Sequence, residues 1–204
     1  MGAASQDRYT SVAVALHWLI ALLIVGMIIA GLWMTKAIDD PKSQVLAFKV
    51  FQLHKSFGLT ILVLSLFRLA WRLMHKVPPL PEMPGWEKIA ARGSHILFYV
   101  IMIGMPLTGW LYVSSGWSPE QGHAFNVPTI FFGMFQVPHI PGLIELPDPQ
   151  RAAIANLFME SHEKLAWFTI ALLTLHIAAA LKHHFADKDD VLTRMLPFLK
   201  PRAP

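Results

Sequence analysis

Four long apolar stretches constrain this chain more than any other feature of its sequence. Residues 9–35 and 93–119 contain no Lys, Arg, Asp or Glu, and about 20 apolar residues suffice to cross the hydrocarbon core of a bilayer. The run 165–181 is uncharged as well and reaches that length with its flanks. The run 56–67 is shorter, so it spans only if the cations around it lie at the helix ends or face the protein interior.

These runs predict an all-α membrane protein, a single domain over residues 1–204 built as a bundle of four transmembrane helices. We place the helices at about 11–34, 47–74, 88–114 and 157–184. Only 15% of the residues are charged, against roughly 25% in soluble domains. The first helix lacks the small-residue cleavage site of a signal peptide, so we expect it to be retained.

The distribution of Lys and Arg predicts that both termini lie in the cytoplasm, because cytoplasmic loops are enriched in these residues. One side of the predicted bundle carries eleven of them: Arg8, Arg68, Arg72, Lys76, Lys88, Arg92, Lys182, Lys188, Arg194, Lys200 and Arg202. The other side carries six: Lys36, Lys42, Lys49, Lys55, Arg151 and Lys164. We call the side with six the outer side.

The residue composition excludes several kinds of redox and binding protein. The chain has no cysteine, which rules out iron–sulfur clusters, disulfides and covalently attached c-type haem. A haem would therefore be held non-covalently, by histidine or methionine. The net charge of +4 does not indicate nucleic-acid binding, because the basic residues cluster at the predicted helix ends.

The connection between the third and fourth helices is about forty residues long, longer than most loops in compact domains. It is rich in proline and contains the aromatic residues Phe125, Phe131, Phe132 and Phe135. Aromatic side chains favour the membrane interface. We therefore expect an ordered cap on the outer membrane face.

Four histidines within the predicted spans carry the strongest functional signal. His162 and His176 are fourteen residues apart, so on a helix they share a face and differ in height by roughly 21 Å. His17 and His54 lie near opposite ends of the first two spans. When histidines at the same depth are paired, His17 pairs with His176 on the inner side and His54 with His162 on the outer side. Two pairs of this kind predict two stacked haems, each with both axial positions filled, which favours electron transfer over oxygen binding.

Arg68 and Arg72 follow His54 on nearly the same helical face, at the inner end of the second span. Ionisable groups inside a membrane need partners, and haem propionates would suit guanidinium groups. The competing interpretation is that both side chains extend to anionic lipid headgroups.

Three further histidines have weaker roles. His95 lies at inner depth and could replace His17 or His176 as a ligand, or bind a quinone; a lone histidine on an apolar face is more often simply hydrogen-bonded. His183 and His184, at the inner interface, could donate to a quinone or relay protons, or anchor the helix end.

Five motifs together resemble the bacterial cytochrome b561 family over almost the whole chain. They are A-L-H-W at 15–18, L-H-K-S-F-G at 53–58, F-R-L-A-W-R at 67–72, S-H-E-K-L-A-W at 161–167 and L-K-H-H-F-A-D-K-D-D at 181–190. The resemblance implies four helices in the bacterial inner membrane that hold two b-type haems. It assigns the axial ligands to His17, His54, His162 and His176.

The resemblance also implies electron transfer between a donor on the periplasmic face and the quinone pool of the respiratory chain. Superoxide is one expected donor, with quinone as acceptor, which would make the protein an oxidoreductase. Lys36, Lys42, Lys49 and Lys55 could attract such an anion, although Asp39 and Asp40 lie in the same loop. The length of the outer connection at 115–157 favours a periplasmic redox protein instead.

Two other functions remain open from the sequence. The chain could be the membrane-anchor cytochrome subunit of a larger dehydrogenase, without a substrate of its own. It could also be a non-haem metal protein, such as a zinc or copper transporter. Against the transporter, a fourteen-residue ligand spacing is too wide for one tetrahedral site, and the uncharged cores of the spans lack carboxylates for an ion pathway.

Overall fold

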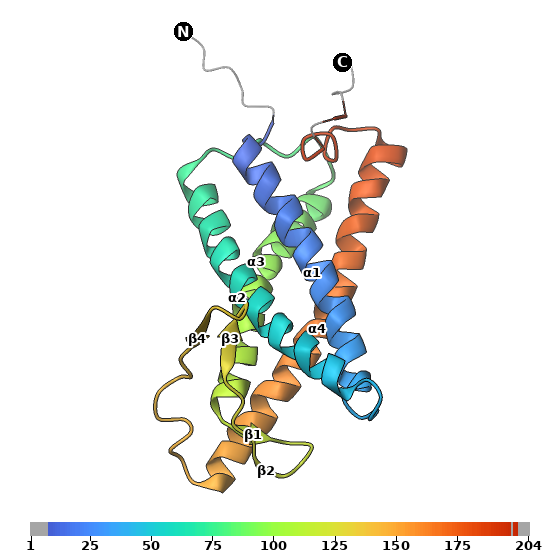
Figure 1. The fold of residues 1–204 in the computed structure, drawn as a ribbon. Coiled ribbons are helices and arrows are strands. Elements are labelled where there is room, and N and C mark those ends of the chain that lie inside the picture. The colour runs from blue at the N-terminus through green and yellow to red at the C-terminus, as the bar shows by residue number, and fades with distance from the viewer. Residues whose placement is uncertain (1–7, 197, 200–204) are drawn as a thin grey trace.

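Four long helices form the body of the protein in the computed structural model, which describes residues 8–196 and 198–199. They are α1 (Ser11–Ala37), α2 (Gln44–Met74), α3 (Gly85–Ser114) and α4 (Asp148–Lys182), and a π-helix, η1 (His183–Asp187), extends α4. Each of the four is long and apolar enough to cross a membrane, which confirms the predicted fold class. The start of α1, the α2–α3 connection and the end of α4 lie at one end of the bundle (Figure 1).

The fourth helix begins earlier than the sequence predicted, at Asp148 rather than near residue 157. Two prolines, Pro147 and Pro149, favoured a loop in the prediction. Pro147 instead caps the helix and Pro149 stands in its first turn, where a missing N–H costs nothing. Asp148 suits the same turn because its negative charge complements the helix dipole. The bounds of α1, α2 and α3 lie within three residues of those predicted.

The surfaces that the helices turn outward are apolar. α1 packs mainly on α2, and α3 packs mainly on α4. Large aliphatic side chains point away from these contacts, including Leu22, Ile29 and Leu175, each more than 60% exposed. Monomeric soluble proteins rarely expose so much contiguous apolar surface, so these faces fit contact with lipid.

The segment after η1 folds back across the end of the bundle. The indole Nε1 of Trp18 donates to the carbonyl of Met195 over 2.7 Å, and Arg194 donates to the carbonyl of Pro79. The chain end thereby ties the start of α1 to the α2–α3 connection. Lys200 and Arg202, which belong to the inner set of cations, lie outside the described residues.

The long connection between α3 and α4 is folded into two small antiparallel hairpins, which the sequence did not predict as strands. β1 (Trp117–Ser118) pairs with β2 (His123–Ala124), and β3 (Thr129–Phe131) pairs with β4 (Phe135–Val137). β3 packs against α2, and β1 packs against α4. The described residues of the connection are therefore ordered, as its aromatic content predicted, and their position as a cap on the outer membrane face stays a prediction.

Arg151 holds the end of α3 to the start of α4. It is only 8% exposed, its Nε donates to the carbonyl of Ser115 over 2.9 Å, and its guanidinium also donates to the carbonyl of Gly116. Carbonyls at a helix C-terminus have no partner within the helix, and Arg151 supplies one. Asp148 pairs with the remaining guanidinium nitrogen at 3.2 Å.

Replacement of Arg151 by alanine should destabilise the protein by about 2–3 kcal/mol, because buried carbonyls lose their donors. In detergent micelles this corresponds to a melting temperature lower by roughly 5–10 °C. Arg92→Ala is the matched control, since Arg92 is exposed on α3. Equal melting temperatures for the two variants would contradict the anchoring role of Arg151.

Candidate functional site

The first cluster of the candidate site, which we call the inner pair, consists of His17 on α1 and His176 on α4. Their ring centroids are 6.3 Å apart, with an angle of 59° between the ring planes. His95 on α3 stands beside them, with its ring centroid 6.0 Å from that of His176. Three helices thus bring three imidazoles together near the end at which α1 begins.

The second cluster, the outer pair, consists of His54 on α2 and His162 on α4. Their ring centroids are 6.2 Å apart and their planes make an angle of 65°. Glycines stand against both rings. A Cβ at Gly31 would lie 3.5 Å from Cε1 of His54, and a Cβ at Gly109 would lie 3.3 Å from Cε1 of His162. The absence of side chains at these positions leaves room for the imidazoles at the centre of the bundle.

The spacing within each pair fits two ligands on opposite sides of one metal. Metal–imidazole bonds are about 2 Å long, so two imidazoles that share one metal have ring centres roughly 6 Å apart. A buried nitrogen of the outer pair, Nδ1 of His54, has no hydrogen-bond partner among the described residues. Buried polar atoms without partners are rare in folded proteins, and a metal bound through this nitrogen or an ordered water hydrogen-bonded to it would account for this one.

Hydrogen bonds fix which nitrogen of His162 can ligate. Its Nδ1 lies 3.0 Å from the carbonyl of Met105 and 3.1 Å from the hydroxyl of Thr108. The Thr108 hydroxyl itself donates a hydrogen bond to the Met105 carbonyl, over 2.7 Å. Both neighbours therefore act as acceptors, so Nδ1 carries the ring proton and Nε2 keeps the lone pair that binds metals.

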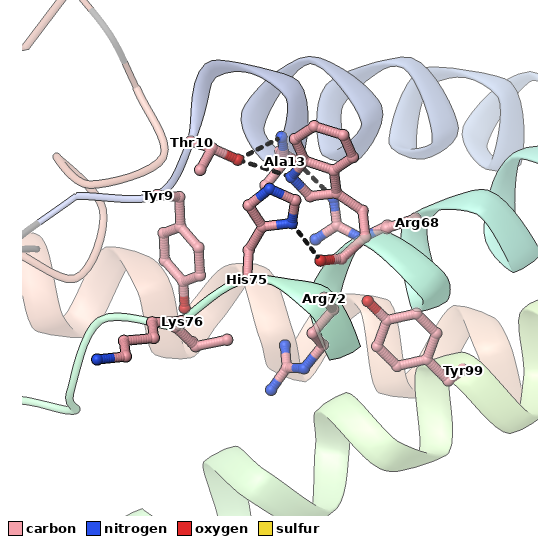
Figure 2. Close-up of a pocket in the computed structure, with 10 residues that line it drawn as sticks. Tyr9, Thr10, Ala13, Arg68, Arg72, His75, Lys76 and Tyr99 are labelled. Atoms are coloured by element: carbon pink, nitrogen blue, oxygen red, sulfur yellow. Dashed lines mark hydrogen bonds between the residues drawn. The ribbon is translucent and has the colours of Figure 1, made fainter.

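The two predicted arginines lie beside the inner pair. Arg68 donates to the carbonyl of Ala13 over 2.7 Å, and its other terminal nitrogen is 3.4 Å from Nδ1 of His17. The Arg72 guanidinium lies over the ring of Tyr99, 5.9 Å from its centroid. Both arginines line a cavity that also contains Lys76, and Figure 2 shows these cations around one opening. The structure therefore concentrates positive charge next to the inner pair.

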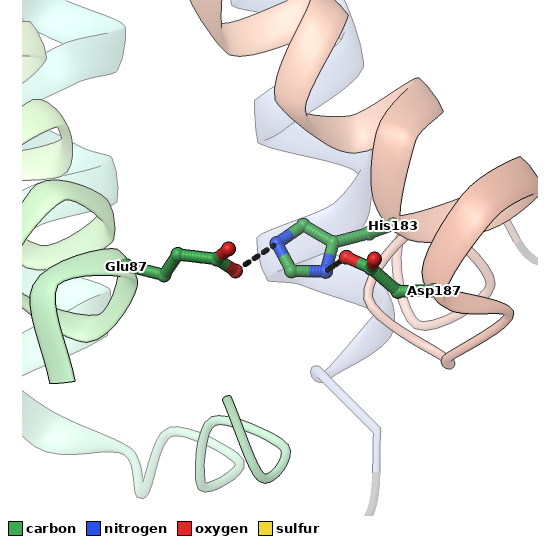
Figure 3. Close-up of side chains that lie close together, drawn as sticks. All are labelled: Glu87, His183 and Asp187. Atoms are coloured by element: carbon green, nitrogen blue, oxygen red, sulfur yellow. Dashed lines mark ion pairs between the residues drawn. The ribbon is translucent and has the colours of Figure 1, made fainter. Parts of the chain in front are cut away.

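Three carboxylates surround the ring of His183. Its Nδ1 is 2.7 Å from a carboxylate oxygen of Asp189 and 3.1 Å from one of Asp187, and its Nε2 is 3.9 Å from Glu87. Figure 3 shows the ring between Glu87 and Asp187. Lys182 bridges the same two carboxylates at 2.9 and 2.8 Å. Carboxylates of α3 and of the segment after α4 thus hold the His183 ring.

The remaining predicted residue of this region, His184, contacts the ring of Phe185 at a centroid distance of 4.9 Å. It is not among the residues that the structure places at the inner pair. The quinone roles predicted for His183 and His184 thus stay predictions.

On the outer side, the cation Lys55 directly follows His54 in the chain. Its ammonium group donates to the carbonyl of Pro128 over 2.9 Å. It also lowers the pKa of His139 in the α3–α4 connection, although burial is the larger cause of that shift. A lowered pKa keeps His139 neutral near pH 7, so Lys55 supplies the positive charge there.

Sequence reasoning missed the residues that position the histidines. Met105 acts through its backbone carbonyl, which no side-chain motif marks. Thr108 and Gly109 follow Pro106 in the third span, and only their facing partner on α4 reveals their role. The four histidines themselves lie in the pairs that depth matching predicted, but their role as ligands remains a prediction.

Comparison with known proteins covers nearly the whole chain. The family model described as prokaryotic cytochrome b561 matches residues 8–198. "Cytochrome b561 homolog 2" of Escherichia coli (strain K12) is 34% identical over 194 residues, which cover 94% of this chain and 93% of that protein. "Probable superoxide oxidase CybB" of Yersinia pestis is 29% identical over 196 residues, with 94% and 97% covered. "Cytochrome b562" of Cereibacter sphaeroides is 30% identical over 193 residues, with 94% and 96% covered.

Proposed function

The chain belongs to the prokaryotic cytochrome b561 family, and we propose that it conducts electrons across the bacterial inner membrane through two b-type haems. Family membership makes it a multi-pass membrane protein of electron transport that binds b-type haem. The number of haems, their ligands, the donor and the acceptor are parts of the proposal. His17 and His176 would hold one haem, and His54 and His162 the other.

The observation that carries this proposal is the pair of equal imidazole spacings at two heights. The centroid distances of 6.3 and 6.2 Å both fit ligation of one iron between two rings. α4 contributes to both pairs, and its two histidines differ in height by roughly 21 Å. Two redox centres at these heights connect the two halves of the membrane.

The residues of the chain hold the ligands in a defined state. Met105 and Thr108 keep the proton of His162 on Nδ1, which directs the Nε2 lone pair toward the outer haem site. Haem supplies one-electron chemistry when bound, and two histidines at each iron would leave no open position for oxygen. The glycines at positions 31 and 109 keep the centre of the bundle free of side chains.

Arg68 offers a further argument for propionates at the inner haem. A guanidinium only donates, so its contact with His17 uses the lone pair of Nδ1. Ligation through Nε2 places the ring proton on Nδ1, and that contact is then lost. We propose that the carboxylates of the inner haem become the acceptors for Arg68, with Arg72 as a second cation nearby.

Replacement of Arg72 by alanine should lower the reduction potential of the inner haem. A nearby positive charge favours the reduced, less positive form of the iron. A unit charge about 10 Å away contributes roughly 1–2 kcal/mol at an effective dielectric constant near 20, so we expect a drop of roughly 50 mV. A spectroscopic redox titration measures the change, with Arg72→Lys as the charge-preserving control. An unchanged potential in Arg72→Ala would favour extension of this side chain to lipid headgroups.

For the donor and acceptor, we propose oxidation of superoxide or of a redox protein on the outer side and reduction of quinone. A relative carries the name probable superoxide oxidase. Lys55 lies next to the outer pair and would attract an anion. We place both termini in the cytoplasm because the larger set of Lys and Arg lies on that side.

A second candidate function is that of a membrane anchor for a larger dehydrogenase or for a periplasmic redox partner. The folded connection between α3 and α4 favours it, because the ordered β1–β2 hairpin presents a defined surface on the outer side. The two functions differ in whether the isolated chain reacts with a small donor.

Rapid mixing of the purified, haem-loaded chain with superoxide separates these candidates. Autonomous function predicts fast haem reduction, followed by reoxidation when a water-soluble quinone is added. The same traces in the presence of superoxide dismutase provide the control. Haems that superoxide leaves oxidised, but that dithionite reduces, would assign the chain to the anchor role.

A further inference from the structure

The β3–β4 hairpin and α2 enclose an apolar groove of about 390 Å³. Its walls include Leu59, Leu62 and Val63 of α2 and Phe131, Phe135 and Val137 of the hairpin. The one hydroxyl in the lining, that of Thr60, donates to the carbonyl of Ser56 over 2.9 Å, so it offers no free donor to a ligand. The groove therefore fits a hydrocarbon chain rather than a polar molecule.

The groove lies on the side of α2 that faces away from the outer pair of histidines. Val63 follows His54 by nine residues, which puts the two side chains about half a turn apart around the helix. The same face continues with Leu66 and Phe67, which are 48% and 49% exposed. This face belongs to a helix that spans the membrane, so the groove is continuous with a surface that lipid covers.

The groove lies at mid-height of a membrane-spanning helix. Leu59 and Val63 lie near the middle of α2, which runs from Gln44 to Met74. β3 and β4 stand beside this part of α2, as Figure 1 shows. The base of the hairpin contacts Lys55 through Pro128, whereas its tip carries Met134 and other apolar residues. The polar contacts with α2 thus lie at the base of the hairpin, and the exposed Gln136 is the one polar side chain between Thr129 and Val137.

Backbone groups at β3, the strand next to α2, have hydrogen-bond partners on that helix. Polar backbone groups in hydrocarbon need internal partners. The hydroxyl of Ser56, which is fully buried, accepts from the N–H of Phe132 over 3.0 Å and shares its single proton between the carbonyls of Gln52 and Ile130, each 3.2 Å away. At the tip, the N–H of Met134 donates to the carbonyl of Phe131 over 2.9 Å. One serine of a spanning helix therefore satisfies the strand edge that faces it.

We propose that the β3–β4 hairpin is inserted into the leaflet on its side of the membrane and that the groove binds one acyl chain of a phospholipid. Phospholipid is the occupant that the continuity of the lipid-facing surface of α2 supports. The exposed rim of the groove, with Phe135 57% and Val63 64% exposed, is apolar on both walls. The hairpin therefore forms one wall of a lipid-binding groove within the membrane.

Cysteine labelling tests the insertion of the hairpin, because the chain contains no cysteine. The variants are Met134→Cys at the hairpin tip, and Gln121→Cys at the exposed turn between β1 and β2 as control. In haem-loaded proteoliposomes, a charged maleimide should modify Gln121→Cys at least tenfold faster than Met134→Cys. Detergent denaturation should remove the difference. Equal rates in the bilayer would overturn the insertion, and so would disulfide-linked dimers of Met134→Cys, because a second copy would then cover the tip.

Native mass spectrometry of the haem-loaded protein tests the lipid. Val63→Trp fills the groove, whereas Leu66→Trp adds the same bulk on the same face outside it. We expect Val63→Trp to lose one bound phospholipid relative to the unaltered chain, and Leu66→Trp to keep it. Equal phospholipid counts for the two variants would overturn the proposal. Loss of the phospholipid from the unaltered chain on addition of a long-tailed quinone would also overturn it, because the occupant would then be a quinone tail.

Discussion

Replacement of His162 by alanine is expected to reduce the haem content from two per chain to one. The variant removes one imidazole of the outer pair, and His54 alone cannot fill both axial positions of an iron. His54→Ala should have the same effect, because the two rings act as one site. The measurement is the ratio of pyridine haemochrome to protein after purification in one detergent.

The control for this experiment is His75→Ala. The His75 ring stacks on Trp71 at a centroid distance of 4.0 Å, and its Nδ1 lies 2.9 Å from the Trp71 carbonyl; it belongs to neither pair, so this variant should retain two haems. If His162→Ala also retained two haems, the outer pair would not be an axial ligand pair. Retention of the inner haem alone would appear as loss of one component from the redox titration.

The second large effect is expected at the inner pair, where three imidazoles compete for two axial positions. His17→Ala and His176→Ala should each leave one haem per chain, whereas His95→Ala should leave two. The reason is that His17 and His176 occupy the positions that match the family motifs, and their centroid distance of 6.3 Å fits ligation of one iron. The same haem count distinguishes the three variants.

A reversed result at this site would have a clear meaning. The ring of His95 lies 6.0 Å from that of His176, so these two could also share an iron. Loss of a haem in His95→Ala, together with two haems in His17→Ala, would transfer the ligand role from His17 to His95. It would leave the outer haem and the conduit between the two membrane faces intact.

The sequence allowed the fold to be predicted because hydrocarbon thickness imposes a minimum length on apolar helices. The start of α4 could not be found this way, since the prolines at positions 147 and 149 are equally compatible with a loop and with a helix start. The two hairpins were also missed. Their strands are two or three residues long, too short for an alternating pattern to mark them.

The candidate site was predictable to the level of its histidine pairs and no further. Helical geometry converts the spacing of His162 and His176 into two depths, and each depth selects one partner. The hydrogen bonds of Met105 and Thr108 to His162 depend on how α3 faces α4, which the sequence of neither helix contains. Arg68 was predicted beside the inner pair, but its bond to the carbonyl of Ala13 follows only from the packing of α1 on α2.

The most direct test of the two-haem conduit is a dithionite-reduced minus oxidised spectrum of the purified chain, combined with a haem count. Sharp b-type bands with two haems per chain are expected, and a redox titration should resolve two one-electron steps. A single haem per chain would contradict a pathway that extends from one membrane face to the other. The absence of b-type bands would contradict ligation of iron by these histidines altogether.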